Sequence, residues 1–502
     1  MSMLNLKNIG GAPASRIRRA NDRSVLPEQE LVLYWMIAAR RPRFNFALDR
    51  ACALARALGK PLLVFEALRV GYPWASDRLH RFVLDGMSDN EQSFGKAGVS
   101  YYPYVEPTRG AGQGLLAELA SRACVVVTDE FPCFFLPRMV AVAAERLDVL
   151  LEVVDSNGLL PLAGTGRDFY AAAHFRRYAQ KALRSHVEEL PLAKPLSERS
   201  SVAFYPVPQH VVERWPRASK KLLAGDAAEL ARLPIDHEVP PVTLRGGAEV
   251  GRRALRSFVS NRLAGYAAHH NEPSIDGTSR LSPYLHFGHI SAHEVFAAVA
   301  DAEQWSPIQL GDRANGARRG FWGMSESAEA FLDQIVVWRE LSYNTCAKRP
   351  HDYDQYESLP EWARATLEAH ARDPRSHVYT RAAFEGARTH DELWNAAQRQ
   401  LRREGWYHNY LRMLWGKKIL EWSRTPREAL GTMIHIMNRW SLDGRNPNSY
   451  AGYLWTLGRY DRPWPERAIY GKVRSMSSKR TRAKVSVDAY VAKFAPLAKG
   501  DA

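Results

Sequence analysis

Three tryptophans in the second half of the chain have a spacing that could support electron transfer between indole rings. Trp415 and Trp422 are seven residues apart in a run with helical periodicity, so they share one helix face about two turns apart. Trp394 belongs to the preceding helical run, before Gly405. An indole has an easily oxidised π-system. The same spacing is also typical of plain core packing, and the sequence alone leaves both interpretations open.

A hydroxyl-rich segment precedes a predicted helix that opens near Pro283. It contains Ser279, Leu281 and Ser282, and it follows Tyr266. Serine hydroxyls and free backbone N–H groups at a helix start can bind an anion such as a pyrophosphate. The alternative is a simple N-cap without a ligand.

A polar group and an indole recur together on the predicted helix from Phe331 to Leu341. Gln334, Trp338 and Leu341 stand at i, i+4 and i+7, which predicts that they share one helix face. Such a face could flank a flat ligand. The alternative is an amphipathic helix with Trp338 in the core.

Arg412 and Asp443 form a candidate ion pair between two distant segments. Arg412 lies in the tryptophan-rich run that ends at Trp422, and Asp443 lies in the turn-forming segment Leu442–Asn448. Trp455 follows this segment. An exposed turn would contain the same residue types.

The elements that must position these residues differ between the two halves of the chain. Residues 29–185 alternate short apolar runs with helical segments, which predicts an α/β domain with a doubly wound parallel sheet. Residues 1–28 are expected to form a flexible arm. Residues 186–250 are rich in proline and charge and are expected to form a connector, and residues 251–502 are expected to form an all-α domain.

Composition adds limits on the class of protein. The formal net charge is +15, which favours polyanionic partners because phosphate contacts release counterions. The four cysteines form no CxxC pair, so neither a disulfide framework nor a metal site is expected. No apolar stretch is long enough to span a bilayer, and no GxGxxG fingerprint follows the first strand. These features predict a cytoplasmic protein without a standard NAD site.

Taken together, these blocks resemble the photolyase/cryptochrome family, specifically class II cyclobutane-pyrimidine-dimer photolyases. The match is loose from Leu31 to Leu183 and close from Ser279 to Met476. The resemblance implies an antenna-type α/β domain followed by a helical domain that holds FAD. It also implies FAD contacts at the following positions: Tyr266, Ser279, Leu281, Ser282, Pro283, Arg412 and Asp443.

The resemblance further implies roles in electron transfer and DNA repair. Trp394, Trp415 and Trp422 match the electron relay of the class. Trp338, Met413 and Trp455 match the walls of a pocket for a pyrimidine dimer flipped out of UV-damaged DNA. A basic tail could contact phosphates; its cations are Lys472, Arg474, Lys479, Arg480, Arg482 and Lys484. A monomer is expected, with a deazaflavin-type antenna chromophore or none.

Two positions depart from the class at the chemistry itself. Gln334 stands where the class has a glutamate that binds the dimer, and an amide cannot supply a proton. Met437 stands where the class has an asparagine near flavin N5, unless a one-residue helix shift brings Asn438 there. These departures leave open a cryptochrome-like blue-light photoreceptor or a photolyase homologue with altered chemistry. A third hypothesis is a nucleic-acid-binding flavoprotein without photochemistry, and the intact tryptophan series argues against it.

Overall fold

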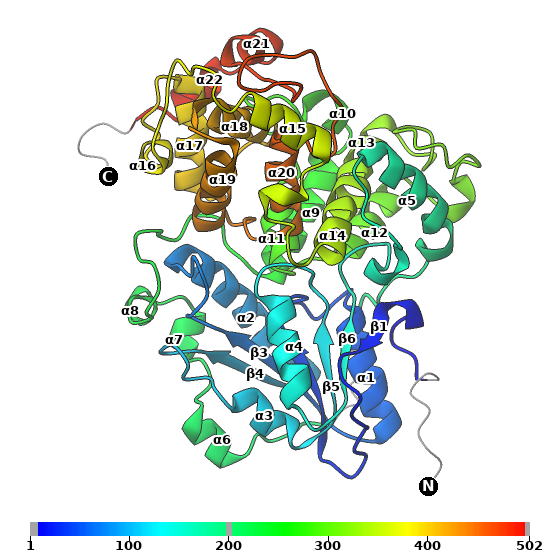
Figure 1. Cartoon of the computed structure of the whole chain (residues 1–502). Helices are drawn as coiled ribbons and strands as arrows, with labels where there is room; N and C mark the ends of the chain where they lie inside the picture. The colour runs from blue at the N-terminus through cyan, green and yellow to red at the C-terminus, as the bar shows by residue number, and fades with distance from the viewer. Residues whose placement is uncertain (1–8, 197–202, 497–502) are drawn as a thin grey trace.

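The computed structural model describes residues 9–196 and 203–496, and it contains a lower α/β part and an upper helical part (Figure 1). The α/β part holds a six-stranded sheet with the strand order β1-β6-β5-β2-β3-β4. Five strands are parallel: β2 (Leu31–Met36), β3 (Leu62–Leu68), β4 (Ser100–Val105), β5 (Ala123–Asp129) and β6 (Leu151–Val154). The expected doubly wound parallel sheet is confirmed for these strands.

Alternation along β2 explains why helices cover both faces of the sheet. Leu31, Leu33 and Trp35 pack on one side, and Val32 and Tyr34 pack on the other, because successive side chains of a strand point to opposite faces. The first side is covered by α3 (Leu115–Ala120) and α4 (Leu136–Arg146), and the second by α1 (Phe46–Leu58) and the end of α2 (Asp77–Ala97).

The edge strand β1 corrects the prediction of a flexible arm over residues 1–28. Ile17–Arg19 pairs antiparallel with β6, and Arg16 is buried with its guanidinium bonded to the carbonyls of Gly158 (2.9 Å) and Leu159 (2.7 Å). A three-residue strand with two arginines has no apolar alternation to reveal it in the sequence. Residues 1–8 of the predicted arm lie outside the described residues.

Short helices interrupt the segment that joins the two parts. They are α6 (Gln209–Arg214), α7 (Lys220–Leu223) and α8 (Ala227–Ala231). The preceding helix, α5 (Ala172–His186), buries Phe175, Ala179 and Leu183 in the same cluster as residues of the helical part.

The upper part is built from helices, as the periodicity predicts. Their bounds are α9 Ala248–Asn261, α10 Tyr266–His269, α11 Ser282–His286, α12 Ala292–Ala302, α13 Glu326–Leu332, α14 Arg339–Lys348, α15 Glu361–Ala369, α16 Arg381–Glu385, α17 Glu392–Glu404, α18 Asn409–Trp422, α19 Pro426–Trp440, α20 Pro447–Thr456, α21 Ser478–Lys484 and α22 Asp488–Lys493. Short 3-10 turns cover Ala14–Arg16, Leu162–Gly164, Pro307–Gln309 and Tyr356–Ser358.

A π-helical turn, η6 (Asp333–Trp338), lies between α13 and α14, where the spacing predicts a regular α-helix. The wider turn departs from the α-helical geometry on which the predicted common face of the three residues was based. Leu341 is buried in the core, whereas Gln334 and Trp338 are half-buried. Single π-turns inside α-helices are frequent at functional sites.

Two buried charges fix the α/β part to the helical part. Arg78 on α2 donates to the carbonyl of Trp440 at 2.6 Å and to that of Arg402 at 2.6 Å. Glu340 on α14 accepts from the backbone N–H groups of Leu159 (2.7 Å) and Leu160 (3.0 Å). Each pairs a buried charge with backbone dipoles, which offsets the cost of removing it from water.

Candidate functional site

Arg412 and Asp443, which lie far apart in the sequence, form the predicted ion pair. One guanidinium nitrogen of Arg412 on α18 lies 2.9 Å from each carboxylate oxygen of Asp443, in the loop between α19 and α20. Asp443 is 5% exposed. The pair is therefore shielded from bulk water, where its attraction is stronger than at the surface.

Hydroxyl groups complete the surroundings of the Asp443 carboxylate. Ser441 donates to it at 2.6 Å, and Ser282 at the start of α11 also hydrogen-bonds to it. Burial alone would raise the pKa of Asp443, but the Arg412 charge and these hydroxyls together lower it below its ordinary value. The carboxylate thus stays ionised, and it joins α11, α18 and the α19–α20 loop.

The remaining residues of the predicted FAD-binding set surround this centre at different depths. Leu281 and Pro283 are buried, and Ser279 is half-buried with its hydroxyl accepting from the Leu281 N–H at 3.4 Å. The neighbouring Thr278 hydroxyl is buried and has no hydrogen-bond partner among the described residues. Tyr266 on α10 stacks on His270, with ring centroids 4.7 Å apart.

The three relay candidates form one continuous series of rings. Trp394 and Trp415 are stacked with centroids 6.2 Å apart and an interplanar angle of 5°, and Trp394 and Trp422 are 6.1 Å apart at 66°. Trp394, on α17, is therefore the middle member. All three are at most 2% exposed.

Hydrogen bonds hold two of the indoles in fixed orientations. The Trp394 N–H donates to the carbonyl of Trp415 at 3.0 Å, and the Trp415 N–H donates to the Gln398 side-chain oxygen at 2.9 Å. At the outer end, Trp422 contacts Tyr379, which is half-buried. The series thus runs from the interior of the helical domain toward its surface.

Tyr407 connects the relay to the ion pair, and its role could not be read from the spacing of residues. Its ring lies 5.9 Å from that of Trp415 and 5.0 Å from the Arg412 guanidinium carbon. Its hydroxyl donates to the Met437 sulfur at 3.3 Å. Tyr407 is 1% exposed, and burial raises its pKa well above its ordinary value.

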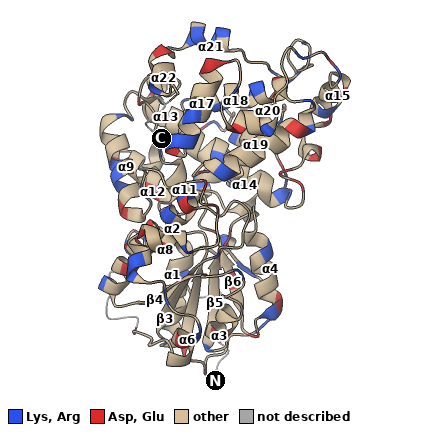
Figure 2. Ribbon diagram, turned by 90° about the vertical axis from the view of Figure 1, so that its left-hand side faces the viewer, with Lys and Arg blue, Asp and Glu red and all other residues tan. Residues whose placement is uncertain are grey.

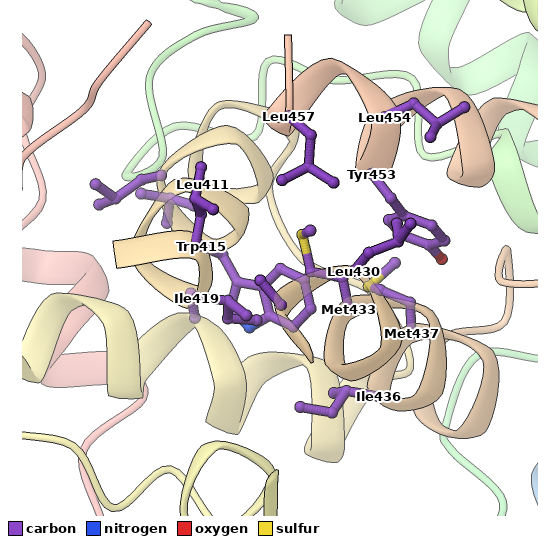
Figure 3. Packing of buried hydrophobic residues seen from close by; sticks show 14 of the residues in the cluster. Leu411, Trp415, Ile419, Leu430, Met433, Ile436, Met437, Tyr453, Leu454 and Leu457 are labelled. Atoms are coloured by element: carbon purple, nitrogen blue, oxygen red, sulfur yellow. The ribbon is translucent and has the colours of Figure 1, made fainter. Parts of the chain in front are cut away.

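Met437 and Asn438 have different surroundings at the end of α19. Met437 packs in the core with Met433, Leu430 and Tyr453 (Figure 3). The Asn438 amide accepts from the Arg445 N–H at 2.8 Å and donates to the Tyr450 hydroxyl at 3.2 Å. The two ends of this amide therefore bind the loop that carries Asp443 and the following helix α20.

The candidate walls of the lesion pocket come from different elements. Trp338 on η6 and Trp455 on α20 are half-buried and pack against the same hydrophobic cluster. Gln334 is half-buried on η6, and its side chain forms no hydrogen bond within the described part of the chain. Met413 is also half-buried, but it packs against the cluster that contains the three relay indoles.

A buried lysine under Trp455 was not predicted from the sequence. The Lys417 ammonium lies 4.6 Å from the Trp455 ring centroid and 2.6 Å from the carbonyl of Thr456. Burial lowers its pKa to about 7. Arg474 of the predicted basic tail lies near the same indole and pairs with Asp461 at 3.0 Å. Other cations of this tail lie on α21, at the top of the molecule (Figure 2).

A cavity of about 490 Å³ lies away from this centre, between the α/β part and α9. Arg41, Arg43 and Arg252 are among its lining residues, together with Glu249 and Glu294. Among residues 9–196 and 203–496, no helix is long and apolar enough to cross a membrane. The same residues contain no group of three or more His, Cys, Asp or Glu side chains placed to hold a metal ion.

Comparison with known proteins gives full-length relatives. The deoxyribodipyrimidine photo-lyase of Methanothermobacter thermautotrophicus is 34% identical over 482 residues, which cover 95% of this chain and 97% of that protein. The deoxyribodipyrimidine photo-lyase of Oryza sativa is 34% identical over 93% of this chain and 88% of its own length. Cryptochrome-2 of Arabidopsis thaliana is 30% identical over 32% of this chain and 23% of its own length. No family model matches.

A solved structure supports the fold. The crystal structure of a bacterial class III photolyase from Agrobacterium tumefaciens superposes with a TM-score of 0.67 and 18% sequence identity. The match covers 93% of this chain and 86% of that chain. It therefore includes both the α/β part and the helical part.

Proposed function

This chain belongs to the photolyase/cryptochrome family, and on that premise we propose that it is a class II photolyase that repairs cyclobutane pyrimidine dimers in DNA. The observation that carries the proposal is the series Trp422–Trp394–Trp415, which ends beside Tyr407 and the Arg412–Asp443 pair. Plain core packing would not require a continuous series of oxidisable rings that ends beside an ionised pair.

The residues around Arg412 and Asp443 fit FAD. The unpartnered Thr278 hydroxyl and the half-buried hydroxyls of Ser279 and Ser282 are suited to the phosphate and ribitol oxygens of a dinucleotide. The Arg412 charge, held in place by Asp443, favours negative charge on a neighbouring ring system. Reduced FAD excited by blue light would donate the electron that splits the two bonds between the pyrimidine rings and would take it back afterwards.

The three indoles would keep the cofactor in its reduced form. Trp415 would give an electron to the photoexcited oxidised flavin, Trp394 would then reduce Trp415, and Trp422 would reduce Trp394. The oxidised Trp422 would be reduced in turn by an external reductant such as a thiol. Ring-centroid separations of 6.2 Å and 6.1 Å favour each transfer because electronic overlap between rings falls steeply with distance. The N–H groups of Trp394 and Trp415 are both used in hydrogen bonds, which limits reorientation of these rings.

We propose that Trp338, Trp455 and Met413 wall the pocket that receives the flipped dimer. Half-buried indoles offer π-faces to the apolar pyrimidine rings, as in other sites that bind unpaired bases. Gln334 would orient the dimer through its free amide, which can donate to a carbonyl oxygen but cannot deliver a proton.

Two further assignments follow from the family and remain proposals. The cavity lined by Arg41, Arg43 and Arg252 is a candidate site for an antenna chromophore of the deazaflavin type, because such a group is flat and carries negative charge. We also propose that the protein acts as a cytoplasmic monomer.

The second candidate function is that of a cryptochrome-like photoreceptor. The observation that favours it is the chemistry of Gln334 and Met437, which replace the glutamate and the asparagine expected at the dimer and at the flavin. Such a protein would still bind FAD and undergo photoreduction, but it would not repair DNA.

One illumination experiment separates these functions. The reduced holoprotein is exposed to blue light with three oligonucleotides that carry one cyclobutane dimer, one (6-4) photoproduct or no damage, and restored thymine is measured by chromatography. We expect recovery from the cyclobutane dimer alone. Recovery from the (6-4) product alone would show a different repair enzyme, and photoreduction without any recovery would support the photoreceptor.

A further inference from the structure

The outer face of α5 is unusually basic for a solvent-exposed helix. The helix contains Arg176, Arg177, Lys181 and Arg184 and no acidic residue. Its apolar side chains are buried, so Arg177, Lys181 and Arg184 are exposed at i, i+4 and i+7 on the opposite face. Like charges at this spacing repel each other and weaken a helix slightly, so helix stability does not explain the arrangement.

A second basic segment, residues 311–319, runs along this face. Arg177 donates to the carbonyl of Asn315 at 3.3 Å, and Arg184 donates to that of Gly311. Gln180 bonds the segment twice, to the Ala317 carbonyl at 2.8 Å and from the Gly316 N–H at 2.7 Å. In Figure 1 this segment, between α12 and α13, lies beside α5 on the flank of the helical part.

The segment brings more positive charge to the same place. It contains Arg313, Arg318 and Arg319, with Asp312 as its acidic residue, and Arg319 pairs with Glu326. We call the exposed cations of the two elements the α5 strip: Arg177, Lys181, Arg184, Arg313, Arg318 and Arg319. Within the described part of the chain, Lys181, Arg313 and Arg318 have no ion-pair or hydrogen-bond partner.

A single buried side chain, that of Arg176, connects the α5 strip to the π-turn that carries Gln334 and Trp338. Arg176, next to Arg177 in α5, binds Asp333 of η6 through two hydrogen bonds of 2.7 Å and 3.2 Å. The same guanidinium reaches the carbonyl of Gly316 in the basic segment at 3.5 Å. Arg176 and Asp333 are both nearly buried, so this joint holds η6 and the strip in a fixed relation.

We propose that the α5 strip binds the phosphate backbone of the DNA duplex beside the flipped lesion. The inference rests on the proposed function, because η6 adjoins DNA only if Gln334 and Trp338 face the lesion. It adds a contact surface from a helix that precedes the catalytic domain in the sequence. Cations without partners on a rigid support are suited to this role, since phosphate contacts position a duplex without reading its sequence.

The test removes three cations that take no part in bracing the segment. The strip variant is Lys181→Gln, Arg313→Gln, Arg318→Gln. The matched control is Arg138→Gln, Arg146→Gln, Lys220→Gln, which removes the same charge from exposed positions on α4 and α7 of the α/β part. Affinity for a duplex with one cyclobutane dimer is measured by fluorescence anisotropy at several salt concentrations.

Affinity falls as salt rises, and each phosphate contact contributes about −0.9 to the slope of log affinity against log salt. We expect this slope to become less negative by about 2 to 3 in the strip variant. The control should keep the parent slope. Equal slopes for the two triple variants would overturn the inference. If the parent itself fails to bind DNA, the proposed function fails instead. Unchanged flavin absorbance and repair at saturating DNA and low salt show that the strip variant is folded.

Discussion

The hydroxyl of Tyr407 donates a hydrogen bond to the sulfur of Met437 across the gap between the start of α18 and the end of α19. This contact of 3.3 Å places a buried polar group beside the position where the family resemblance expects an asparagine. Tyr407 also contacts Trp415 and Arg412. This one side chain therefore contacts the relay, the ion pair and Met437.

We therefore predict that Met437→Asn changes the absorption spectrum that forms when the oxidised holoprotein is illuminated. The asparagine carbonyl would accept the Tyr407 hydrogen bond and leave its NH₂ group free to donate. Tyr407→Phe removes only the hydroxyl and should cost about 0.5–1.5 kcal/mol in unfolding free energy. Identical spectra for the parent and the two variants would show that neither position faces the cofactor.

Asp443→Asn should release most of the bound FAD. It leaves the Arg412 charge, whose side chain is 21% exposed, without its ionised partner, which costs at most the roughly 3–5 kcal/mol of breaking a fully buried pair. Ser441→Ala, which removes one hydrogen bond to the same carboxylate, is the matched control and should retain the cofactor. Flavin absorbance after gel filtration measures both. Equal retention of FAD by the two variants would show that the ion pair does not help to bind the cofactor.

The same ion pair predicts a pH dependence for cofactor retention. The pKa of Asp443 lies below its ordinary value of 3.8, so its contribution is present above the unfolded pKa and is lost as the pH falls through the lower folded value. Flavin fluorescence, which rises on release, should therefore stay low down to about pH 4. Release in the range from pH 5 to pH 6 would indicate that another group holds the cofactor.

Trp394→Phe should slow photoreduction, because Trp394 is the middle member of the relay. Phenylalanine keeps the packing but is hard to oxidise. Without the middle indole, an electron must pass directly between Trp422 and Trp415, which lie about 10 Å apart along α18. We expect a fall of about tenfold or more, equivalent to about 1.4 kcal/mol of barrier. Trp440→Phe, at another buried indole outside the series, is the control for packing. Transient absorption reads both rates.

Gln334→Glu should raise the number of dimers repaired per absorbed photon. A hydrogen bond that involves a charged group contributes about 1.5–3 kcal/mol, against about 0.5–1.5 kcal/mol for a neutral one, and a protonated glutamate can also supply a proton. Gln334→Ala should lower the yield below that of the parent. If the parent already equals the glutamate variant, the amide suffices and the departure has no functional meaning.

Lys417 predicts a rise in stability with pH. Its folded pKa of about 7 lies below the ordinary value of 10.5, so between these values the unfolded chain binds more protons than the folded one. The free energy of unfolding should rise from pH 7 to pH 9 in the parent and rise less in Lys417→Met. Urea titrations at both pH values test this, and parallel changes in the two proteins would contradict it.

Local patterns in the sequence determined the fold class and most members of the site. Apolar runs that alternate with helical segments predicted the parallel sheet, because strand and helix periods are set by neighbouring residues. Trp415 and Trp422 share a helix, so their spacing alone placed them on one face. The pairing of Arg412 with Asp443 was predicted from charge and from the resemblance.

The tertiary structure decided which residues from separate elements meet. Trp394 is the middle of the relay because α17 packs across α18, and Tyr407 meets Met437 because α18 packs on α19. The π-turn at Asp333–Trp338 and the edge strand at Ile17–Arg19 have no periodic signal of their own, since each depends on partners more than 100 residues away: Arg176 for the turn and β6 for the strand. Side-chain spacing describes one element at a time, whereas these contacts exist only once helices and strands are packed together.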